Sequence, residues 1–240
     1  MSLRLRILQV DVPGPDLASV TSFWAQALSA EPVDAPGAFT HLVGATSALE
    51  VHIQAQTHGP PGYHLDLEVT DTSRDVEVAR LVAAGGRRIA TFDGDGYTAV
   101  ADPAGLPHCI IDADAAVPTP VAPRREGHGY LDAIFLDVPA GLADAEVAWW
   151  ADALGARPQP PPGPGSPYTD LAGVLGPGGP VTVEVQAIGG APRLHVDVSA
   201  PDVGVEVDRL RRLGASHVAD VEDWVTLADP VGNLLCVVPA

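Results

Sequence analysis

The sequence contains no lysine, so all 13 of its basic residues are arginines. Schiff-base chemistry, lysine-anchored pyridoxal phosphate and the lysine of a phosphate-binding loop are therefore excluded. Only two cysteines occur, Cys109 and Cys236, so no disulfide framework is implied. No apolar run approaches the ~18 residues of a membrane span. Arg4, Arg6 and Gln9 interrupt the N-terminal apolar stretch, which has no signal-peptide layout, and we expect a cytoplasmic protein.

Positive charge is also scarce. The 31 acidic residues outnumber the basic ones, and the formal net charge is −18. Such a surface repels nucleic acid and anionic membranes, so neither is expected as a partner. The same charge attracts a cationic ligand. With 46% hydrophobic residues, the 240-residue chain can bury the core of one large domain or of two ordinary ones.

The sequence contains an internal repeat. Residues 8–32 align without gaps on residues 134–158, at an offset of 126. Two further blocks recur in the same order. They are HLDLEVTD from His64 with HVDVSAPD from His195, and TAVADPAGLPHCII from Thr98 with TLADPVGNLLCVV from Thr226. We therefore predict two domains, at 1–113 and 129–240, joined by a Pro-rich linker at 114–128.

Each half is predicted to contain two modules of the form βαβββ. An alternating strand at Arg6–Val12 precedes a helix with an apolar stripe from Leu17 to Leu28, which Asp16 can cap. Gly85 and Gly86 are predicted to end the second helix. Further strands are expected at Phe39–Val43, Leu49–Gln54, Tyr63–Val69, Arg88–Phe92, Tyr97–Ala101 and Cys109–Asp112.

The order of these motifs resembles the vicinal oxygen chelate superfamily of glyoxalases, bleomycin-resistance proteins and extradiol dioxygenases. The resemblance rests on the aromatic pairs Phe23-Trp24 and Trp149-Trp150, and on two D-P-x-G turns that start at Asp102 and Asp229. It covers almost the whole chain outside the linker. It implies an α+β fold in which four βαβββ modules form two cup-shaped mixed sheets, with helices outside and small-molecule chemistry inside each cup.

Metal-dependent members of that superfamily take their ligands from the first and last strands of each module. In this sequence the resemblance places Gln9 and Phe135 at the first position, and His64 and His195 on the strand that opens the second module of each half. At the last position, where a Glu is usual, it places Cys109 and Cys236. Phe135 cannot bind a metal, and the expected carboxylate is absent in both halves.

The remaining position stays open among side chains that share a strand face by alternation. Gln54 and Gln186 are favoured over His52 and its repeat counterpart Glu184. The ligand-pocket residues predicted for the two cups are Gln9, His52, Gln54, His64, Cys109, Phe135, Glu184, Gln186, His195 and Cys236.

Other conspicuous residues have simpler interpretations. A cysteine in an apolar strand usually behaves as a small buried hydrophobe, and the Trp149-Trp150 pair fits helix-to-sheet core. We expect Asp11, Asp66, Asp137 and Asp197 to face away from the apolar side of their strands, and assign them no catalytic work. His108 is expected to line the first cup or its rim.

Two functions stay open, and so does a third class, a structural remnant or regulatory partner with both cups idle. The favoured one is a binding protein of the bleomycin-resistance type, without a catalytic metal, for a cationic or aromatic small molecule. The alternative is a glyoxalase-type lyase or isomerase in the first-half cup, with zinc, nickel, manganese or iron held by His64 and Gln9. Extradiol ring cleavage needs two His and one Glu in the second half, where Phe135, His195 and Cys236 supply one of the three. The sequence leaves a monomer and a homodimer equally open.

Overall fold

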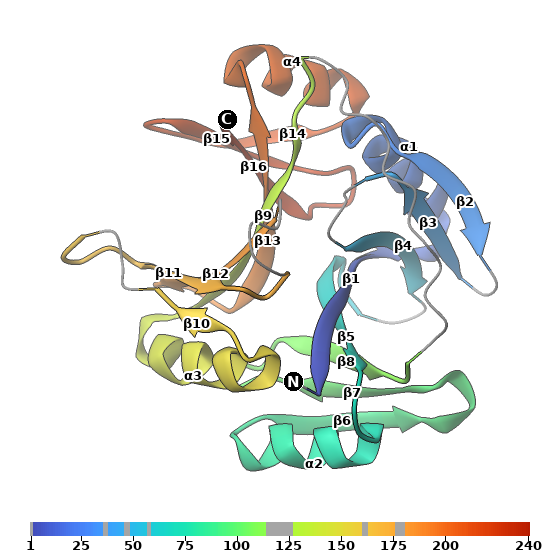
Figure 1. The fold of residues 1–240 in the computed structure, drawn as a ribbon. Helices are drawn as coiled ribbons and strands as arrows, with labels where there is room; N and C mark the ends of the chain where they lie inside the picture. The colour runs from blue at the N-terminus through green and yellow to red at the C-terminus, as the bar shows by residue number, and fades with distance from the viewer. Residues whose placement is uncertain are drawn as a thin grey trace. The chain divides into compact units, whose positions relative to one another are not determined.

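A computed structural model of the chain describes residues 2–35, 38–45, 49–56, 59–113, 127–159, 163–175 and 181–240. Of the linker predicted at 114–128, only Gly127 and His128 lie within these ranges. The elements follow the predicted pattern of four βαβββ modules, and each half of the sequence contributes one eight-stranded mixed sheet (Figure 1). The predicted fold class is therefore confirmed.

The first sheet has the strand order β2-β3-β4-β1-β5-β8-β7-β6. Its strands are β1 (Leu3–Pro13), β2 (Glu31–Ala35), β3 (Phe39–Val43), β4 (Glu50–Gln56), β5 (Gly62–Val69), β6 (Arg87–Phe92), β7 (Tyr97–Ala101) and β8 (Pro107–Ile111). The sequence analysis placed seven of these strands within a few residues and missed β2. That strand is mostly exposed and contains Pro32, so it carries no alternating pattern.

The second sheet repeats the first, with the order β10-β11-β12-β9-β13-β16-β15-β14. Its strands are β9 (Tyr130–Pro139), β10 (Arg157–Pro158), β11 (Tyr168–Ala172), β12 (Thr182–Ile188), β13 (Arg193–Ala200), β14 (Ser216–Val221), β15 (Trp224–Ala228) and β16 (Leu234–Pro239). The repeated topology is the structural counterpart of the repeated sequence blocks.

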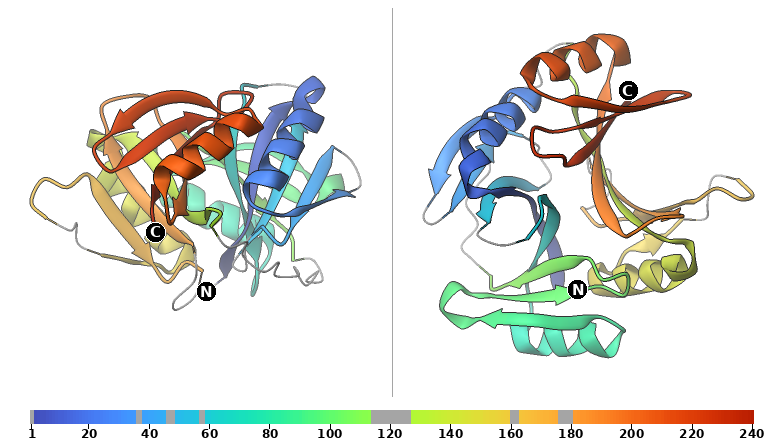
Figure 2. Two further views of the ribbon diagram at one scale, coloured as in Figure 1. Left: turned by 90° about the horizontal axis from the view of Figure 1, so that it is seen from above. Right: turned by 180° about the vertical axis from the view of Figure 1, so that it is seen from behind.

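One helix follows the opening strand of each module. The helices are α1 (Leu17–Ala27), α2 (Arg74–Ala83), α3 (Ala143–Leu154) and α4 (Val203–Leu213). Within its own module, α2 packs on β6 and β7, and α4 packs on β15 and β16 (Figures 1 and 2). The predicted Trp149-Trp150 core is confirmed, because the two side chains are 1% and 0% exposed.

The helix ends follow local chemistry with one exception. Gly85 ends α2 with a φ of 113°, a left-handed backbone angle that glycine adopts without strain. The prediction that Asp16 caps α1 was wrong in its mechanism: Asp16 is the N-cap residue, but its side chain makes no capping hydrogen bond. The cause is a short 3-10 turn, Gly14–Asp16, which already leads the chain into the helix.

The strands that position the candidate site are paired in parallel. Strand β5 pairs with β8 so that Asp66 lies opposite Cys109. Strand β13 pairs with β16 in the same register, with Asp197 opposite Cys236. The pairs β2–β3, β3–β4, β6–β7 and β7–β8 are antiparallel. Their counterparts in the second sheet, β10–β11, β11–β12, β14–β15 and β15–β16, are antiparallel too.

Contacts between Cα atoms group the chain into two compact units, and each unit draws on both halves of the sequence. The first contact unit comprises Met1–Ile7, His64–Val117 and Phe135–Leu194, and holds α2 and α3. The second comprises Leu8–Tyr63, Pro118–Ile134 and His195–Ala240, and holds α1 and α4.

Arginines join the helices within each unit. In the first unit, Arg80 of α2 donates hydrogen bonds to the main-chain oxygens of Asp152 and Ala153 at the end of α3. In the second, Arg209 of α4 donates to those of Gln26 and Ala27 at the end of α1. Both contacts place a cation at a helix C-terminus, where the helix dipole favours it.

Candidate functional site

Three polar side chains lie close together where β5 and β8 pair: the predicted pocket residues His64 and Cys109, and Asp66. His64 and Asp66 lie on one face of β5, while Leu65 and Leu67, which are fully buried, lie on the other. Nε2 of His64 is 3.2 Å from Oδ1 of Asp66. The ligand atoms of His64, Asp66 and Cys109 all lie within 4.8 Å of one another. We call these three residues the β5–β8 triad.

The second half repeats this arrangement. His195, Asp197 and Cys236 occupy the equivalent positions on β13 and β16, and their ligand atoms also lie within 4.8 Å of one another. The imidazole and the carboxylate are farther apart here, at 3.6 Å. The thiol of Cys236 is 3.5 Å from the hydroxyl of Thr226. The first half therefore holds the closer His–Asp pair.

Asp66 and Asp197 were missed by the sequence reasoning. They do face away from the apolar side of their strands, as predicted, but that is the side on which the histidines lie. The signal was present in the sequence, because H-x-D places both side chains on one strand face and recurs in both halves. Asp66 therefore supplies a carboxylate to the cluster, whereas the Glu that is usual at the position of Cys109 is absent.

The other predicted pocket residues lie on separate strands. Gln9 on β1 is 3% exposed. Gln54 on β4 has a buried side-chain oxygen with no hydrogen-bond partner in the described part of the chain. Such an acceptor costs about 1–3 kcal/mol unless a donor satisfies it. His52, two residues before Gln54, has its Nε2 2.9 Å from the carboxylate of Glu50.

In the second half, an aromatic contact occupies the position that the resemblance gives to a first-strand ligand. The ring of Phe135 on β9 packs edge-on against Tyr168 on β11, with the ring centroids 6.0 Å apart. Gln186 on β12 donates to the hydroxyl of Tyr168 at 3.3 Å, and Glu184 lies two residues earlier on the same strand. This group offers an aromatic surface and an amide, and Phe135 offers no metal ligand.

His108 does not line the site, and its predicted position was wrong. It is 0% exposed, and its Nε2 is 2.9 Å from Oδ2 of Asp102. Alternation along β8 explains the error, because His108 precedes Cys109 and must lie on the opposite face. Burial lowers the pKa of His108 to about 3, so the ring is neutral at physiological pH.

Two buried carboxyl groups, those of Asp102 and Glu146, lie beside His108. Glu146 of α3 accepts hydrogen bonds from Nε1 of Trp150 at 2.8 Å and from the main-chain nitrogen of Ala104 at 3.1 Å. Burial, reinforced by a hydrogen bond with Asp102, raises the pKa of Glu146 to about 8. The pair therefore holds a proton at neutral pH and forms part of the core of the first contact unit.

The fold agrees with comparisons to known proteins. The sequence profile of the glyoxalase-like domain matches residues 8–111 and again residues 133–238, which together cover most of the chain. This chain belongs to the glyoxalase-like domain family. No functionally curated protein matches it.

Solved structures similar to this glyoxalase-like protein include a glyoxalase and dioxygenases. The Mn(II)-bound glyoxalase from Novosphingobium aromaticivorans matches with 18% identity, a TM-score of 0.68, and coverage of 98% of this chain and 81% of that one. The 2,2',3-trihydroxybiphenyl 1,2-dioxygenase from Sphingomonas wittichii strain RW1 matches with 14% identity, a TM-score of 0.61 and coverage of 100% and 91%. A catechol 2,3-dioxygenase matches at 16% identity and a TM-score of 0.63, with coverage of 99% and 87%. At these identities the likeness shows the fold.

The donor atoms of this glyoxalase-like protein suit a particular class of metal. An imidazole nitrogen, a carboxylate oxygen and a thiolate sulfur are all zinc ligands, and three of them leave a fourth position for water or substrate. The sulfur and the imidazole nitrogen make the triad softer than the oxygen donors that suit manganese. The β5–β8 triad therefore fits zinc better than manganese.

A tyrosine completes the polar surroundings of the triad. Tyr97 on β7 stacks on Phe92, with the ring centroids 4.6 Å apart. Burial, together with the charges of Cys109 and Asp95, raises the pKa of Tyr97. Its hydroxyl keeps its proton at neutral pH and can act as a hydrogen-bond donor. The sequence analysis assigned it no role, since nothing in its strand distinguishes it from a structural tyrosine.

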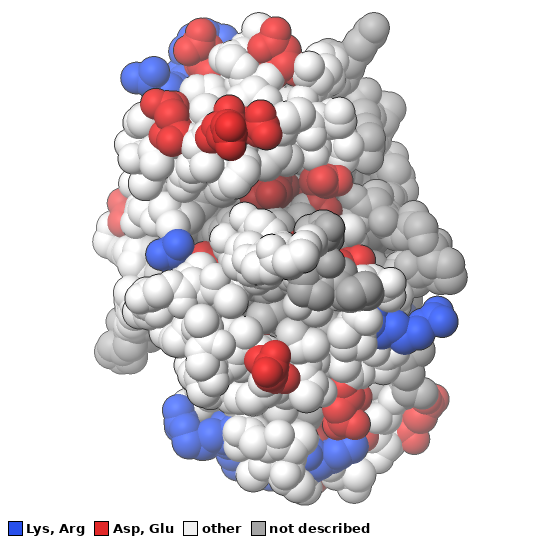
Figure 3. All heavy atoms as spheres, turned by 90° about the vertical axis from the view of Figure 1, so that its left-hand side faces the viewer, with Lys and Arg blue, Asp and Glu red and all other residues white. Residues whose placement is uncertain are grey.

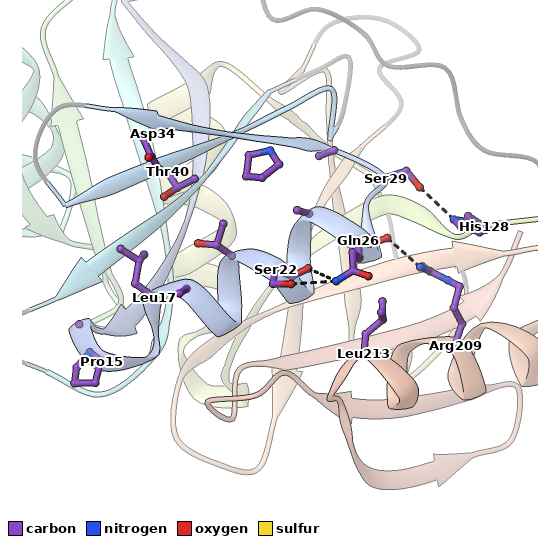
Figure 4. A pocket seen from close by; sticks show the side chains of 16 residues that line it. Pro15, Leu17, Ser22, Gln26, Ser29, Asp34, Thr40, His128, Arg209 and Leu213 are labelled. Carbon is purple, nitrogen blue, oxygen red and sulfur yellow. Dashed lines mark hydrogen bonds between the residues drawn. The ribbon is translucent and has the colours of Figure 1, made fainter.

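The second contact unit of this glyoxalase-like protein also has an open cavity of about 1020 Å³ beside α1 (Figure 4). None of the predicted pocket residues lines it. Several of its polar groups bond to one another: Arg209 to the carbonyl of Gln26, and Ser29 to the imidazole of His128 at 3.2 Å. These polar groups are therefore engaged within the protein, and we assign the cavity no functional role.

On the face shown in Figure 3, several acidic side chains lie close together near the upper end, and acidic and basic side chains lie beside one another near the lower end. None of the helices in the described ranges combines the length and apolar character needed to cross a bilayer.

Proposed function

We propose that this protein binds a small molecule at the β5–β8 triad and does so without a catalytic metal. The observation that carries the proposal is the convergence of His64, Asp66 and Cys109 on the face of the sheet opposite the hydrophobic core. A binding pocket needs an apolar frame and a few polar groups that fix the orientation of its ligand. His64 and Asp66 supply an imidazole–carboxylate pair, and Tyr97 supplies a neutral hydroxyl nearby.

The proposed ligand is cationic or aromatic. The net charge of −18 favours the approach of a cation, and the carboxylate of Asp66 gives it a local partner. The aromatic side chain of Tyr97, which lies near the triad, can contact a flat ring. The proposal carries with it the expectation of a cytoplasmic monomer or homodimer.

A metal-dependent glyoxalase-type lyase is the second candidate, favoured by the distance of at most 4.8 Å between the three donor atoms. His64, Asp66 and Cys109 would hold zinc. The bound metal would polarise the oxygen atoms of a chelating substrate. Tyr97 would then donate a hydrogen bond to the substrate.

The test is a thermal-shift screen of cationic and aromatic compounds, run with and without a chelator. A compound that binds only the folded state stabilises it by RT ln(1 + c/Kd) at a free ligand concentration c, so the melting temperature rises with ligand concentration. We expect hits that persist in chelator and disappear in the His64→Ala variant. The matched control is His195→Ala, which makes the same change at the repeat position.

Metal content measured by mass spectrometry separates the two candidates. The protein is analysed as purified and after incubation with zinc, nickel, manganese and ferrous iron. About one equivalent of zinc in the wild type that is lost in both His64→Ala and Cys109→Ala would replace the metal-free proposal with the lyase. Hits that survive His64→Ala would contradict the assigned pocket.

A further inference from the structure

Two histidines face each other across neighbouring strands, apart from the β5–β8 triad. His41 on β3 and His52 on β4 are direct partners in the antiparallel pairing. Their rings stack in parallel, with the centroids 3.8 Å apart and the planes inclined by 3°. The stack brings imidazole nitrogens from two neighbouring strands close together.

A carboxylate lies beside the pair. Glu50 is two residues before His52 on β4, so both side chains lie on one strand face. Oε2 of Glu50 is 2.9 Å from Nε2 of His52. Ligand atoms of His41, Glu50 and His52 all lie within 4.8 Å of one another. We call these residues the β3–β4 cluster.

The cluster lies on the face of its strands that is turned away from the core. The alternate residues on β4, Val51 and Ile53, are 2% and 0% exposed and form the apolar side. The side chain of His52 is 7% exposed, while that of Glu50 is 17% exposed. An ion could therefore reach the cluster from solvent and still be partly desolvated when bound.

The second half keeps the positions and changes the donors. The cross-strand pair Asp170 and Glu184 occupies the place of His41 and His52. Thr182 stands where the first half has Glu50, and its hydroxyl is 3.4 Å from Glu184. The fold therefore does not require imidazoles at these positions, and the two-histidine set is a property of the first half alone.

We propose that His41, Glu50 and His52 bind a first-row divalent cation of the zinc, nickel or cobalt class. Two imidazole nitrogens and one carboxylate oxygen are donors that such ions accept, while calcium and magnesium prefer oxygen alone. Binding requires the two rings to leave their stack, so that each nitrogen turns to the ion. This site shares no residue with the β5–β8 triad and contains no sulfur.

Cobalt(II) is the probe, because its absorption spectrum reports its ligands. The experiment uses the full chain with both cysteines replaced, Cys109→Ala and Cys236→Ala, which removes every thiolate. We expect this protein to bind about one equivalent of cobalt(II), with visible ligand-field bands and no thiolate charge-transfer band. Adding His41→Ala should weaken the binding at least ~10-fold.

Two variants guard against a trivial loss of folding. Glu50→Gln keeps the size of the side chain and removes its charge, and it should also weaken cobalt binding. Asp170→Ala makes the change equivalent to His41→Ala in the second half and should leave the affinity unchanged. Circular dichroism and melting temperature establish that each variant is folded.

The pH dependence provides an independent readout. Protons compete with the ion for imidazole nitrogen, so the affinity should fall as the pH is lowered through the range in which histidine protonates. Absence of cobalt binding in the cysteine-free protein would overturn the proposal, as would equal affinities with and without His41. Neither result bears on the β5–β8 triad, whose signature is the charge-transfer band in the wild type.

Discussion

The indole Nε1–H of Trp24 donates a hydrogen bond of 3.0 Å to Oδ2 of Asp229, 205 residues later in the chain. The equivalent tryptophan of the other half, Trp150, donates instead to Glu146, four residues before it. The repeats have kept their tryptophans and changed the partner. Each indole thus satisfies a buried carboxyl group, and each should matter for stability.

Trp24→Phe removes the donor to Asp229 while keeping an aromatic ring in the core. We expect a loss of about 1–3 kcal/mol in the free energy of unfolding, because the buried carboxylate loses a partner. Urea unfolding measures the change. A cycle with Asp229→Asn isolates the pair: a coupling energy of at least ~0.5 kcal/mol is expected. Additive effects would show that ring volume alone accounts for the loss.

Arg209→Met should strongly destabilise the second contact unit. The variant leaves Glu206, whose side chain is 1% exposed, without the arginine that pairs with it at 2.5 Å. Breaking a buried ion pair on one side costs about 3–5 kcal/mol. Combining it with Glu206→Met should restore much of the loss in urea unfolding. A single variant within about 1 kcal/mol of the wild type would show that the pair is already well solvated.

The raised pKa of Glu146 leads us to expect a loss of stability as the pH rises. Its pKa is about 8 in the folded chain, against an ordinary value of 4.5. Between these values the folded state holds a proton that the unfolded state releases, so the free energy of unfolding falls with rising pH. One proton corresponds to at most about 1.4 kcal/mol per pH unit.

The window from pH 6.5 to about 8 isolates this effect. His108 is protonated in the unfolded state only below its ordinary pKa of 6.5, so its contribution to the pH dependence lies at lower pH. Urea unfolding across the window should show a slope in the wild type and a flatter profile in Glu146→Gln. Glu222→Gln, an exposed change, is the control. Parallel profiles in all three proteins would mean that Glu146 ionises normally.

Cys109 should react with a thiol reagent faster than Cys236. Cys109 is partly exposed and Cys236 is buried, although neither forms a disulfide and the two occupy equivalent positions. Thiol labelling followed by mass spectrometry should find the first label on Cys109, and Cys109→Ala should remove the fast phase. A ligand or zinc ion at the β5–β8 triad should protect it. Equal rates for the two cysteines would contradict the difference in burial.

The repeats, the module order and most strand positions were predictable from the sequence, because alternation and helical periodicity are local signals. Strand β7 was predicted at its observed bounds, Tyr97–Ala101. Strand β2 was not, since its exposed residues around Pro32 carry no pattern.

The site was harder to predict than the fold. His64 and Cys109 were placed by the family resemblance, but Asp66 was set aside although it shares a strand face with His64. His41 gave no signal, because only the pairing of β3 with β4 brings it to His52. Contacts across strands depend on register, which a single sequence does not state.

Each contact unit pairs one helix from the first half of the sequence with one from the second, and this pairing bears on the origin of the chain. In one contact unit, the helix of an opening module, α1, meets that of a closing module, α4; in the other, α3 meets α2. By the repeat, these are the same pairing made twice. A chain of half the length could form the same helix pairing by associating with a second copy of itself. The present protein thus has the contact pattern of a homodimer whose two subunits have been fused into one polypeptide.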